Sequence, residues 1–407
     1  MSSPIPAAAP TAMTGRSVAP DLARGLMLLL IAVANAPAFL WGGARGSFGN
    51  HTAEGSVADR VAQTVAIIGI DGRVYPMFAF LFGYGIVQLY RRQTVAGVPH
   101  TEARRLLRRR HWWMVAFGFV HAALLWYSDI LGGYGLIGLI LVRLFLDRAD
   151  RTLRIWIGVL VALLALLAAG PALAAIAAEG PGRGVSVIDE WPLTANAEPD
   201  LLAAAWARIA AWAVYGLPTA LFGLIIPVSV LLGMLAARHR LLDEPARHLP
   251  MLRRAAVVGL GIGWGSGLVV ALQNVGGLGI DRGYDFAFVE AHSVGGLFGG
   301  VGYVALFGLA AAHVEANGRR REAGVPWAVQ AVGKRSLSFY LFQSVVFAPL
   351  LCAWGFGLGQ HLSSWSVALL AVATWLVSVA LAVRLERAGE HGPAERLLRR
   401  LSYPRST

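Results

Sequence analysis

The sequence predicts an all-α fold, a polytopic transmembrane helical bundle of about ten spans with both termini in the cytoplasm. Hydrophobic residues make up 57% of the 407 residues and charged residues only 14%, whereas about 25% are charged in an ordinary globular protein. Apolar stretches that approach membrane-spanning length recur along the chain. Arginine and lysine are concentrated in alternate loops between these stretches, which is the pattern of a positive-inside topology.

The apolar stretches define the predicted spans in order. A bilayer core of roughly 30 Å needs about 20 helical residues per crossing. A further helix at 57–70 is expected to lie at the outer surface or to dip into it. The spans themselves are expected at residues 22–41, 74–90, 112–127, 130–145, 153–176, 212–236, 255–272, 294–314, 336–354 and 366–383.

The basic loops set the orientation and explain the formal charge of +12. Because such loops stay on the cytoplasmic side, both termini are expected there, and no nucleic-acid partner is expected. Residues 1–20 are interpreted as a flexible tail, 21–385 as one transmembrane domain and 386–407 as a basic cytoplasmic tail. The basic loops lie at 91–110, 143–154, 238–254, 319–335 and from 384 onward.

Ionisable side chains inside spans cost roughly 2.5–3.5 kcal/mol each, so they are candidate site residues. His121 and Asp129 stand on either side of a short turn between two predicted spans, with Tyr134 one turn further on. In a tight antiparallel hairpin the carboxylate would orient the imidazole and raise its basicity, as a general base requires. Alternatively, His121 bonds a helix carbonyl and Asp129 only caps the following helix.

Other polar residues form stripes on predicted helices. Arg24 and Asn35 are eleven residues apart and therefore share one face of the first span. Arg24 either lines a site or snorkels to the inner interface. Ser336, Tyr340 and Gln343 share one face of the ninth span, as a substrate-binding stripe or as hydrogen bonds between helices.

The segment "IDGR" at 70–73 interrupts a long apolar stretch. Irregular backbone at membrane depth is tolerated only beside protein or a watery cavity, so Asp71 and Arg73 are expected to border one. The other interpretation is an ordinary solvated turn. The outer histidines His51, His292 and His361 show no metal-ligand spacing, and no metal is expected.

Four blocks resemble YeiB-like bacterial membrane proteins. They are "DLARGLMLLLIAVAN" (21–35), "GRVYPMFAFLFGYG" (72–85), "GFVHAALLWYSDILGGYGLIGL" (118–139) and "VGKRSLSFYLFQSVVFAPLLCAWGFGL" (332–358). The resemblance implies a multi-pass protein of the bacterial cytoplasmic (inner) membrane. That family is often described as involved in transport.

The first block is also similar to transmembrane acyltransferases such as heparan-alpha-glucosaminide N-acetyltransferase, in its arginine followed by glycine and its deeper asparagine. This likeness implies acyl-CoA as the donor substrate and makes Arg24, Asn35 and His121 leading candidates. The acyltransferases place a histidine shortly after the asparagine. The nearest equivalent here is His51, at a different spacing.

Three functions follow as hypotheses. In a membrane acyltransferase, His121 and Asp129 form the base and Asn35 holds the oxyanion. A transporter or exporter of a small metabolite uses broken helices and buried polar groups for its substrate. In a membrane scaffold, the polar groups of the first, third and ninth spans would be separate from one another, with no cavity joining them. The expected partners are the lipid bilayer and a small-molecule substrate, and a homo-oligomer is a possible assembly.

Overall fold

The computed structural model describes residues 18–53, 55–177, 194–316 and 324–403. Within these residues the only extended pairing is one isolated bridge between Arg45 and Thr52, so the all-α prediction is confirmed. The longer helices are α1 (Val18–Asn35), α3 (Val74–Val95), α4 (His100–Leu124), α6 (Asp150–Ala177), α11 (Leu249–Asn274), α12 (Asp285–Ala316) and α15 (Ser364–Arg387).

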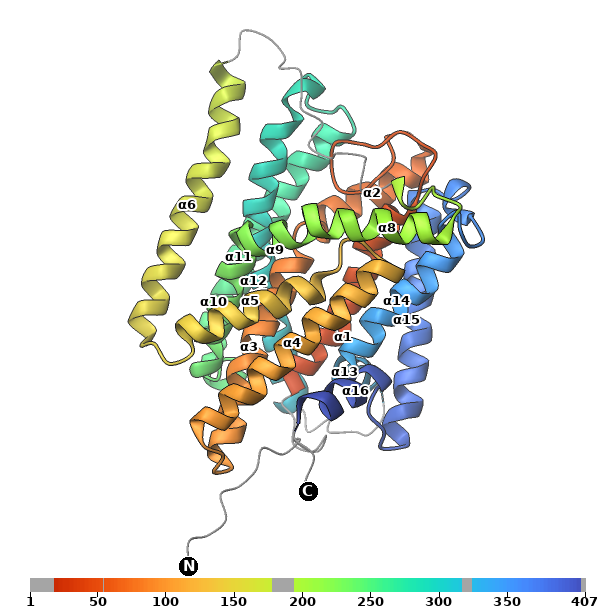
Figure 1. Cartoon of the computed structure of the whole chain (residues 1–407). Coiled ribbons are helices and arrows are strands. Elements are labelled where there is room, and N and C mark those ends of the chain that lie inside the picture. Colours follow the sequence, from red (N-terminus) through yellow and green to blue (C-terminus); the bar gives the residue numbers. More distant parts are fainter. Residues whose placement is uncertain (1–17, 54, 178–193, 317–323, 404–407) are drawn as a thin grey trace, which may run out of the picture.

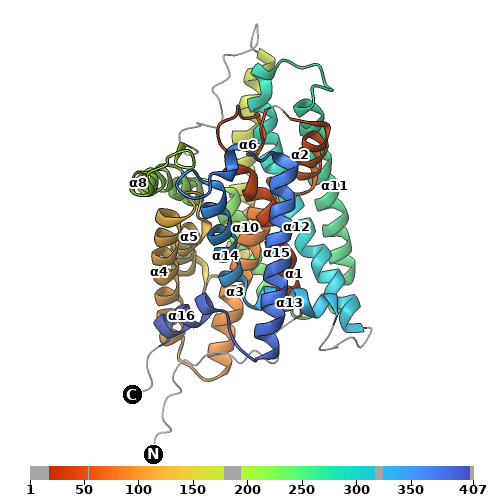
Figure 2. The ribbon, with the colours of Figure 1, turned by 90° about the vertical axis from the view of Figure 1, so that its right-hand side faces the viewer.

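Shorter helices complete the bundle. Among the described residues, seven helical stretches are long and apolar enough to cross a membrane. Three shorter helices, α5, α10 and α14, are also apolar. Figure 1 and Figure 2 both show α8 lying across the axis of the bundle. The shorter helices are α2 (Val57–Gly69), α5 (Ile130–Phe145), α8 (Leu201–Ala211), α9 (Leu217–Phe222), α10 (Ile225–Arg238), α13 (Val325–Lys334), α14 (Ser336–Leu351) and α16 (Pro393–Ser402).

Three of the arginine-rich loops meet at one end of the bundle, which we call the basic end (91–110, 143–154 and 238–254). Ion pairs join these loops to one another. We call the opposite end the far end. The arginine-rich loops gather at the basic end because alternate connections between antiparallel helices lie on the same side of the bundle. The pairs are Arg91 with Asp243 at 2.9 Å, Arg104 with Asp147 at 2.5 Å and Arg238 with Asp150 at 2.8 Å.

The predicted sixth span, 212–236, is not one continuous helix. A π-helical turn, Trp212–Gly216, follows α8, and α9 then ends at Phe222. Gly223 adopts an extended backbone (ψ 112°), and α10 begins two residues later. Hydropathy alone does not register such a break, because every residue around it is apolar or small. The prediction of a single helix was therefore wrong.

The break predicted at "IDGR" is present. The helix α2 ends at Gly69 and α3 begins at Val74, with Gly72 at a positive φ of 75° that favours glycine between them. A capping box between Ser56 and Asp59 starts α2. The Asp59 carboxylate also accepts a hydrogen bond from the Trp365 backbone at 3.0 Å, which ties α2 to the start of α15.

Both ends of the chain were predicted to be tails. The expected tail, residues 1–20, lies outside the described residues except for its last three, which already belong to α1. The expected basic tail, 386–407, contains α16, which packs against α4 and α14 with Leu398 buried. This segment therefore forms part of the packed structure at the basic end.

Close approach of α3 and α10 gives a stability prediction. A Cβ on Gly233 would overlap the carbonyl oxygen of Phe80, and Gly83 faces Val230 in the same way. Gly233→Ala should therefore lower the free energy of unfolding by about 1–3 kcal/mol, as overpacking does. At the control position Gly261 nothing lies within 4 Å, so Gly261→Ala should be neutral or stabilising. Thermal unfolding in detergent checks this, and equal effects would contradict the packing.

Candidate functional site

The His121–Asp129 pair is formed where α4 and α5 turn back on each other. His121 Nδ1 lies 2.8 Å from Asp129 Oδ1, and both side chains are buried. The other carboxylate oxygen accepts a hydrogen bond from Gly132 N at 2.7 Å and so caps α5. Asp129 therefore contacts His121 and caps α5 at the same time. Gly118 permits this contact, because a Cβ there would overlap Gly132 and the Asp129 carboxylate.

Tyr340 of α14 joins this pair from the opposite side. Its hydroxyl lies 3.5 Å from Asp129 Oδ1 and accepts a hydrogen bond from Ile130 N at 3.4 Å. The rings of Tyr340 and His121 are 5.2 Å apart between centroids. His121 Nε2 is buried and has no hydrogen-bond partner among the described residues. With Nδ1 bonded to a carboxylate, this nitrogen is the one suited to take a proton.

A cavity of about 230 Å³ reaches Tyr340 from the basic end. Phe78 and Arg92 line it from the same helix, fourteen residues apart, so it extends about 21 Å along α3 at 1.5 Å per residue. Apolar side chains, including Met27 and Phe82, form much of its wall. Neither His121 nor Asp129 lines it. Tyr340 is thus the group that connects the cavity with the buried pair.

The polar lining of the cavity is mainly cationic, although Arg24 pairs with Asp21 at 3.1 Å and Lys334 pairs with Glu386 at 2.5 Å. The one carboxylate among its described lining residues, Glu395 of α16, accepts hydrogen bonds from Leu337 N at 2.8 Å and Ser338 N at 3.2 Å at the start of α14. That negative charge is therefore already engaged by the positive end of a helix. The cations that line the cavity are Arg24, Arg92, Arg110, Lys334 and Arg399.

Tyr403 lies in the cavity wall just beyond α16. Burial raises the pKa of its hydroxyl, while the nearby guanidinium groups of Arg110 and Arg399 act in the opposite direction. Both arginines are therefore close enough to favour negative charge at this point. An anionic ligand entering from the basic end would meet the same field.

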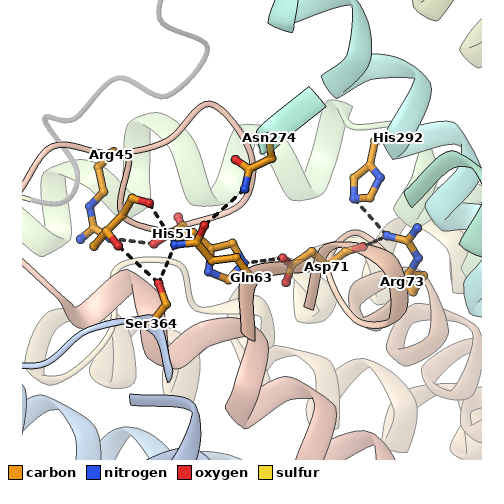
Figure 3. A network of polar contacts seen from close by, with 10 residues as sticks. Arg45, His51, Gln63, Asp71, Arg73, Asn274, His292 and Ser364 are labelled. Atoms are coloured by element: carbon orange, nitrogen blue, oxygen red, sulfur yellow. Dashed lines mark hydrogen bonds and ion pairs between the residues drawn. The ribbon is translucent and has the colours of Figure 1, made fainter. Parts of the chain in front are cut away.

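A second polar network lies at the far end, shown in Figure 3. His51 Nε2 lies 2.8 Å from Asp71 Oδ2. Arg73 is fully buried and bonds the carbonyl oxygens of Asp71 and Gly263, with His292 Nε2 3.0 Å from its Nη1. Asp71 and Arg73, predicted to border a cavity, therefore lie in this network and line no part of the cationic cavity.

The network continues through Gln63 of α2. Its amide donates to Ser364 Oγ at 3.0 Å, and its oxygen accepts from Asn274 at 3.3 Å. Three helices, α2, α11 and α15, are joined in this way (Figure 3). Among the described residues no group of three His, Cys, Asp or Glu side chains is arranged to hold a metal ion.

The remaining predicted residues divide between the cavity and helix packing. Arg24 and Ser336 line the cavity together with Tyr340. Tyr134 instead donates to the Tyr75 carbonyl at 2.9 Å and stacks on Phe78. Two members of the ninth-span stripe, Ser336 and Tyr340, therefore share one cavity with Arg24 of the first-span stripe.

Two further predicted residues make no hydrogen bond to the His121–Asp129 pair among the described residues. Gln343 donates to the Leu28 carbonyl at 2.8 Å and so holds α14 against α1. Asn35 is the last residue of α1, and its side chain makes no hydrogen bond to His121 or Asp129 in the described part of the chain. Among the described residues, no hydrogen bond therefore joins Asn35 to the pair.

Sequence reasoning missed the contribution of the C-terminal region to the cavity. Lys334, His391, Glu395 and Arg399 line it although they lie more than 220 residues from Arg110 in sequence. The signal that could have indicated them was the amphipathic pattern of "PAERLLRRLS", with apolar and basic residues on separate faces.

Comparisons with known proteins agree with the resemblance seen in the sequence. Residues 236–405 match the family model described as "Protein of unknown function (DUF418)". The chain is 36% identical over 134 residues to the "Uncharacterized protein YeiB" of Escherichia coli (strain K12), with 32% of each protein covered. It is 27% identical over 364 residues to the "Uncharacterized protein YxaH" of Bacillus subtilis (strain 168), covering 86% of this chain and 83% of that relative.

The two matches differ in extent. The match to YeiB covers less than two thirds of that relative's length, and the match to YxaH covers most of it. Together with the family model, they confirm the YeiB-like resemblance.

Proposed function

Because the chain is a YeiB-like membrane protein, we propose that it is a transmembrane acyltransferase. It moves an acyl group from a cytosolic acyl-CoA-type donor to a small or sugar-like acceptor. The observation that carries this proposal is the cationic cavity, which extends from the basic end to Tyr340 beside the His121–Asp129 pair.

The proposed topology places the basic end in the cytoplasm of a bacterial cell, with the bundle in the cytoplasmic membrane. Both α1 and α16 reach the cavity at that end through Arg24 and Arg399, which supports cytoplasmic termini. The helix α4 is included because its second half is apolar, although its first half carries arginines. The ten proposed spans are α1, α3, α4, α5, α6, the α9–α10 pair, α11, α12, α14 and α15.

The cavity suits a long donor that is anionic at one end and uncharged at the other. Phosphate groups of a CoA-type molecule would lie among the cations, because guanidinium groups bind phosphate in pairs of hydrogen bonds. The thioester end would lie toward Tyr340, between apolar walls. Arg24 and Ser336 are then donor-binding residues, while Asp71 and Arg73 belong to the acceptor side at the far end.

The reaction needs a base and a polarised thioester carbonyl. A hydroxyl or amine of the acceptor attacks the carbonyl carbon, so a C–O or C–N bond forms and the C–S bond breaks. The acceptor proton passes to His121 Nε2 and then to the departing CoA thiolate. Asp129 holds the other ring nitrogen, which fixes the tautomer. Asn35 remains our candidate for stabilising the oxyanion.

A transporter or exporter of a small metabolite is the second candidate, and one observation favours it. The chain is interrupted at 70–73, between α2 and α3, and again at Gly223, between α9 and α10. Paired broken helices are typical of transporter substrate sites. Solute movement across proteoliposomes without a covalent change in the solute would support this candidate over acyl transfer.

Acyl transfer is tested with purified protein in proteoliposomes, radiolabelled acetyl-CoA and a panel of sugar and amino-alcohol acceptors. Tyr340→Phe should reduce the rate about two- to tenfold, because an ordinary hydrogen bond contributes about 0.5–1.5 kcal/mol and this contact is long. The matched control is Tyr134→Phe, since that hydroxyl bonds a backbone carbonyl away from the pair. Equal rates for the two variants would remove Tyr340 from the site.

A further inference from the structure

Three arginines are among the largest fully buried side chains of the described residues. Two of them have compensating partners. Arg335 lies 2.7 Å from the Glu386 carboxylate, and Arg73 lies in the far-end network that contains the Asp71 carboxylate. The third, Arg208 of α8, makes one hydrogen bond to the described residues, from its Nε to the Ala123 carbonyl at 3.1 Å.

The guanidinium of Arg208 keeps two donor nitrogens without a partner. Its Nη1 and Nη2 are buried and have no acceptor in the described part of the chain. The group lies over the Trp354 ring at 5.7 Å, and such a cation–π contact offsets only part of the cost of a buried charge. No described carboxylate forms an ion pair with it.

Two buried tryptophans also carry donors without acceptors in the described part of the chain. Trp212, four residues along the same helical stretch, has an unpartnered buried Nε1. Trp126 has another, and it packs in the same apolar cluster as Trp354. Four buried N–H-bearing nitrogens thus face no acceptor near the turn that joins α4 and α5. A site with donors, a positive charge and no acceptor complements an oxyanion.

We infer that Arg208, with Trp126 and Trp212, binds an oxyanion, a phosphate or carboxylate carried by the acyl acceptor. The inference rests on the proposed function for the identity of its ligand, but the anion site itself does not depend on catalysis. Arg208 lies close to the proposed base, because its hydrogen-bond partner Ala123 follows His121 by two residues at the end of α4. The anionic group would be anchored at the far side of the hairpin from the donor cavity.

Binding is tested by thermal unfolding of the full chain in nanodiscs. Inorganic phosphate is added to discs of zwitterionic lipid at constant ionic strength, and a second arm uses discs that contain phosphatidylglycerol. We expect either oxyanion to raise the unfolding midpoint of the wild type. A rise with phosphate alone assigns a soluble ligand, and a rise with phosphatidylglycerol alone assigns a lipid headgroup.

Arg208→Met is the decisive variant. It should lose the larger part of the rise, leaving only what phosphate binding in the donor cavity contributes. Without an anion it should unfold at a higher temperature than the wild type, because an unpaired buried charge has been removed. The matched control Arg335→Met breaks a buried ion pair and should unfold at a lower temperature. Arg399→Gln, in the donor cavity, should keep the part of the rise that Arg208→Met loses.

Two results would overturn the inference. One is a wild type that responds to neither oxyanion, and the other is an Arg208→Met variant that keeps the response or is destabilised like Arg335→Met. Anion binding with no acyl transfer would leave this site standing and remove the proposed function. Acyl transfer with no anion response would remove only this site.

Discussion

Replacing His121 by alanine is expected to reduce acyl transfer by about 10²- to 10⁴-fold, the usual contribution of a positioned general base. The reason lies in the pair itself, since Asp129 engages Nδ1 at 2.8 Å and leaves Nε2 without a partner among the described residues. The rate of transfer from radiolabelled acetyl-CoA, compared at equal amounts of folded protein, measures the effect.

The variant Asp129→Asn tests whether the carboxylate charge beside His121 is needed, while it keeps the helix cap that supports the α4–α5 hairpin. Asparagine caps a helix as well as aspartate does, so the cap on Gly132 should survive while the charge beside the imidazole is lost. We expect a folded protein with a strongly reduced rate. His51→Ala is the control, because it removes the other histidine that bonds a carboxylate. If His51→Ala abolishes transfer and His121→Ala does not, the base lies at the far end instead.

The double substitution Arg110→Gln, Arg399→Gln is expected to raise the donor concentration needed for half-maximal rate by at least about tenfold. Each hydrogen bond to a charged group contributes about 1.5–3 kcal/mol, and 1.4 kcal/mol corresponds to a factor of ten. Both arginines line the cavity. The effect should appear mainly in KM, because phosphates far from the reacting carbon bind alike in the ground and transition states.

The matched control for this charge removal is Arg105→Gln. Arg105 lies on the same helix as Arg110, is largely exposed and pairs with Glu102 at 2.6 Å outside the cavity. Its substitution should leave KM for the donor unchanged. A KM shift of the same size in both variants would show that the whole basic surface, and not the cavity, attracts the donor.

Local features were predictable from the sequence. The helix α5 begins and ends at the predicted residues, Ile130 and Phe145. The capping aspartate marks its start, and the mostly apolar run that follows sets its length. The contact of His121 with Asp129 followed from a turn too short to separate two antiparallel helices. The break at "IDGR" followed from charged residues and a glycine inside an apolar stretch.

Features that depend on tertiary packing were not predictable. The cavity collects cations from α1, α3, α4, α13 and α16, and no spacing in a single sequence reveals which distant helices meet. The break at Gly223 is hidden by apolar neighbours. The neighbours of Asn35 could not be predicted either, because sharing a helix face with Arg24 fixes the direction of a side chain but not the residue that it meets.

The central claim is that the donor binds in the cationic cavity with its acyl end at Tyr340. A cryo-electron microscopy structure with a non-hydrolysable acetyl-CoA analogue tests it most directly. We predict density for the phosphate groups among Arg92, Arg110 and Arg399, and for the acyl end beside Tyr340. An analogue bound at the far end, beside His51 and Asp71, would contradict the account, as would an empty cavity under conditions in which the protein is active.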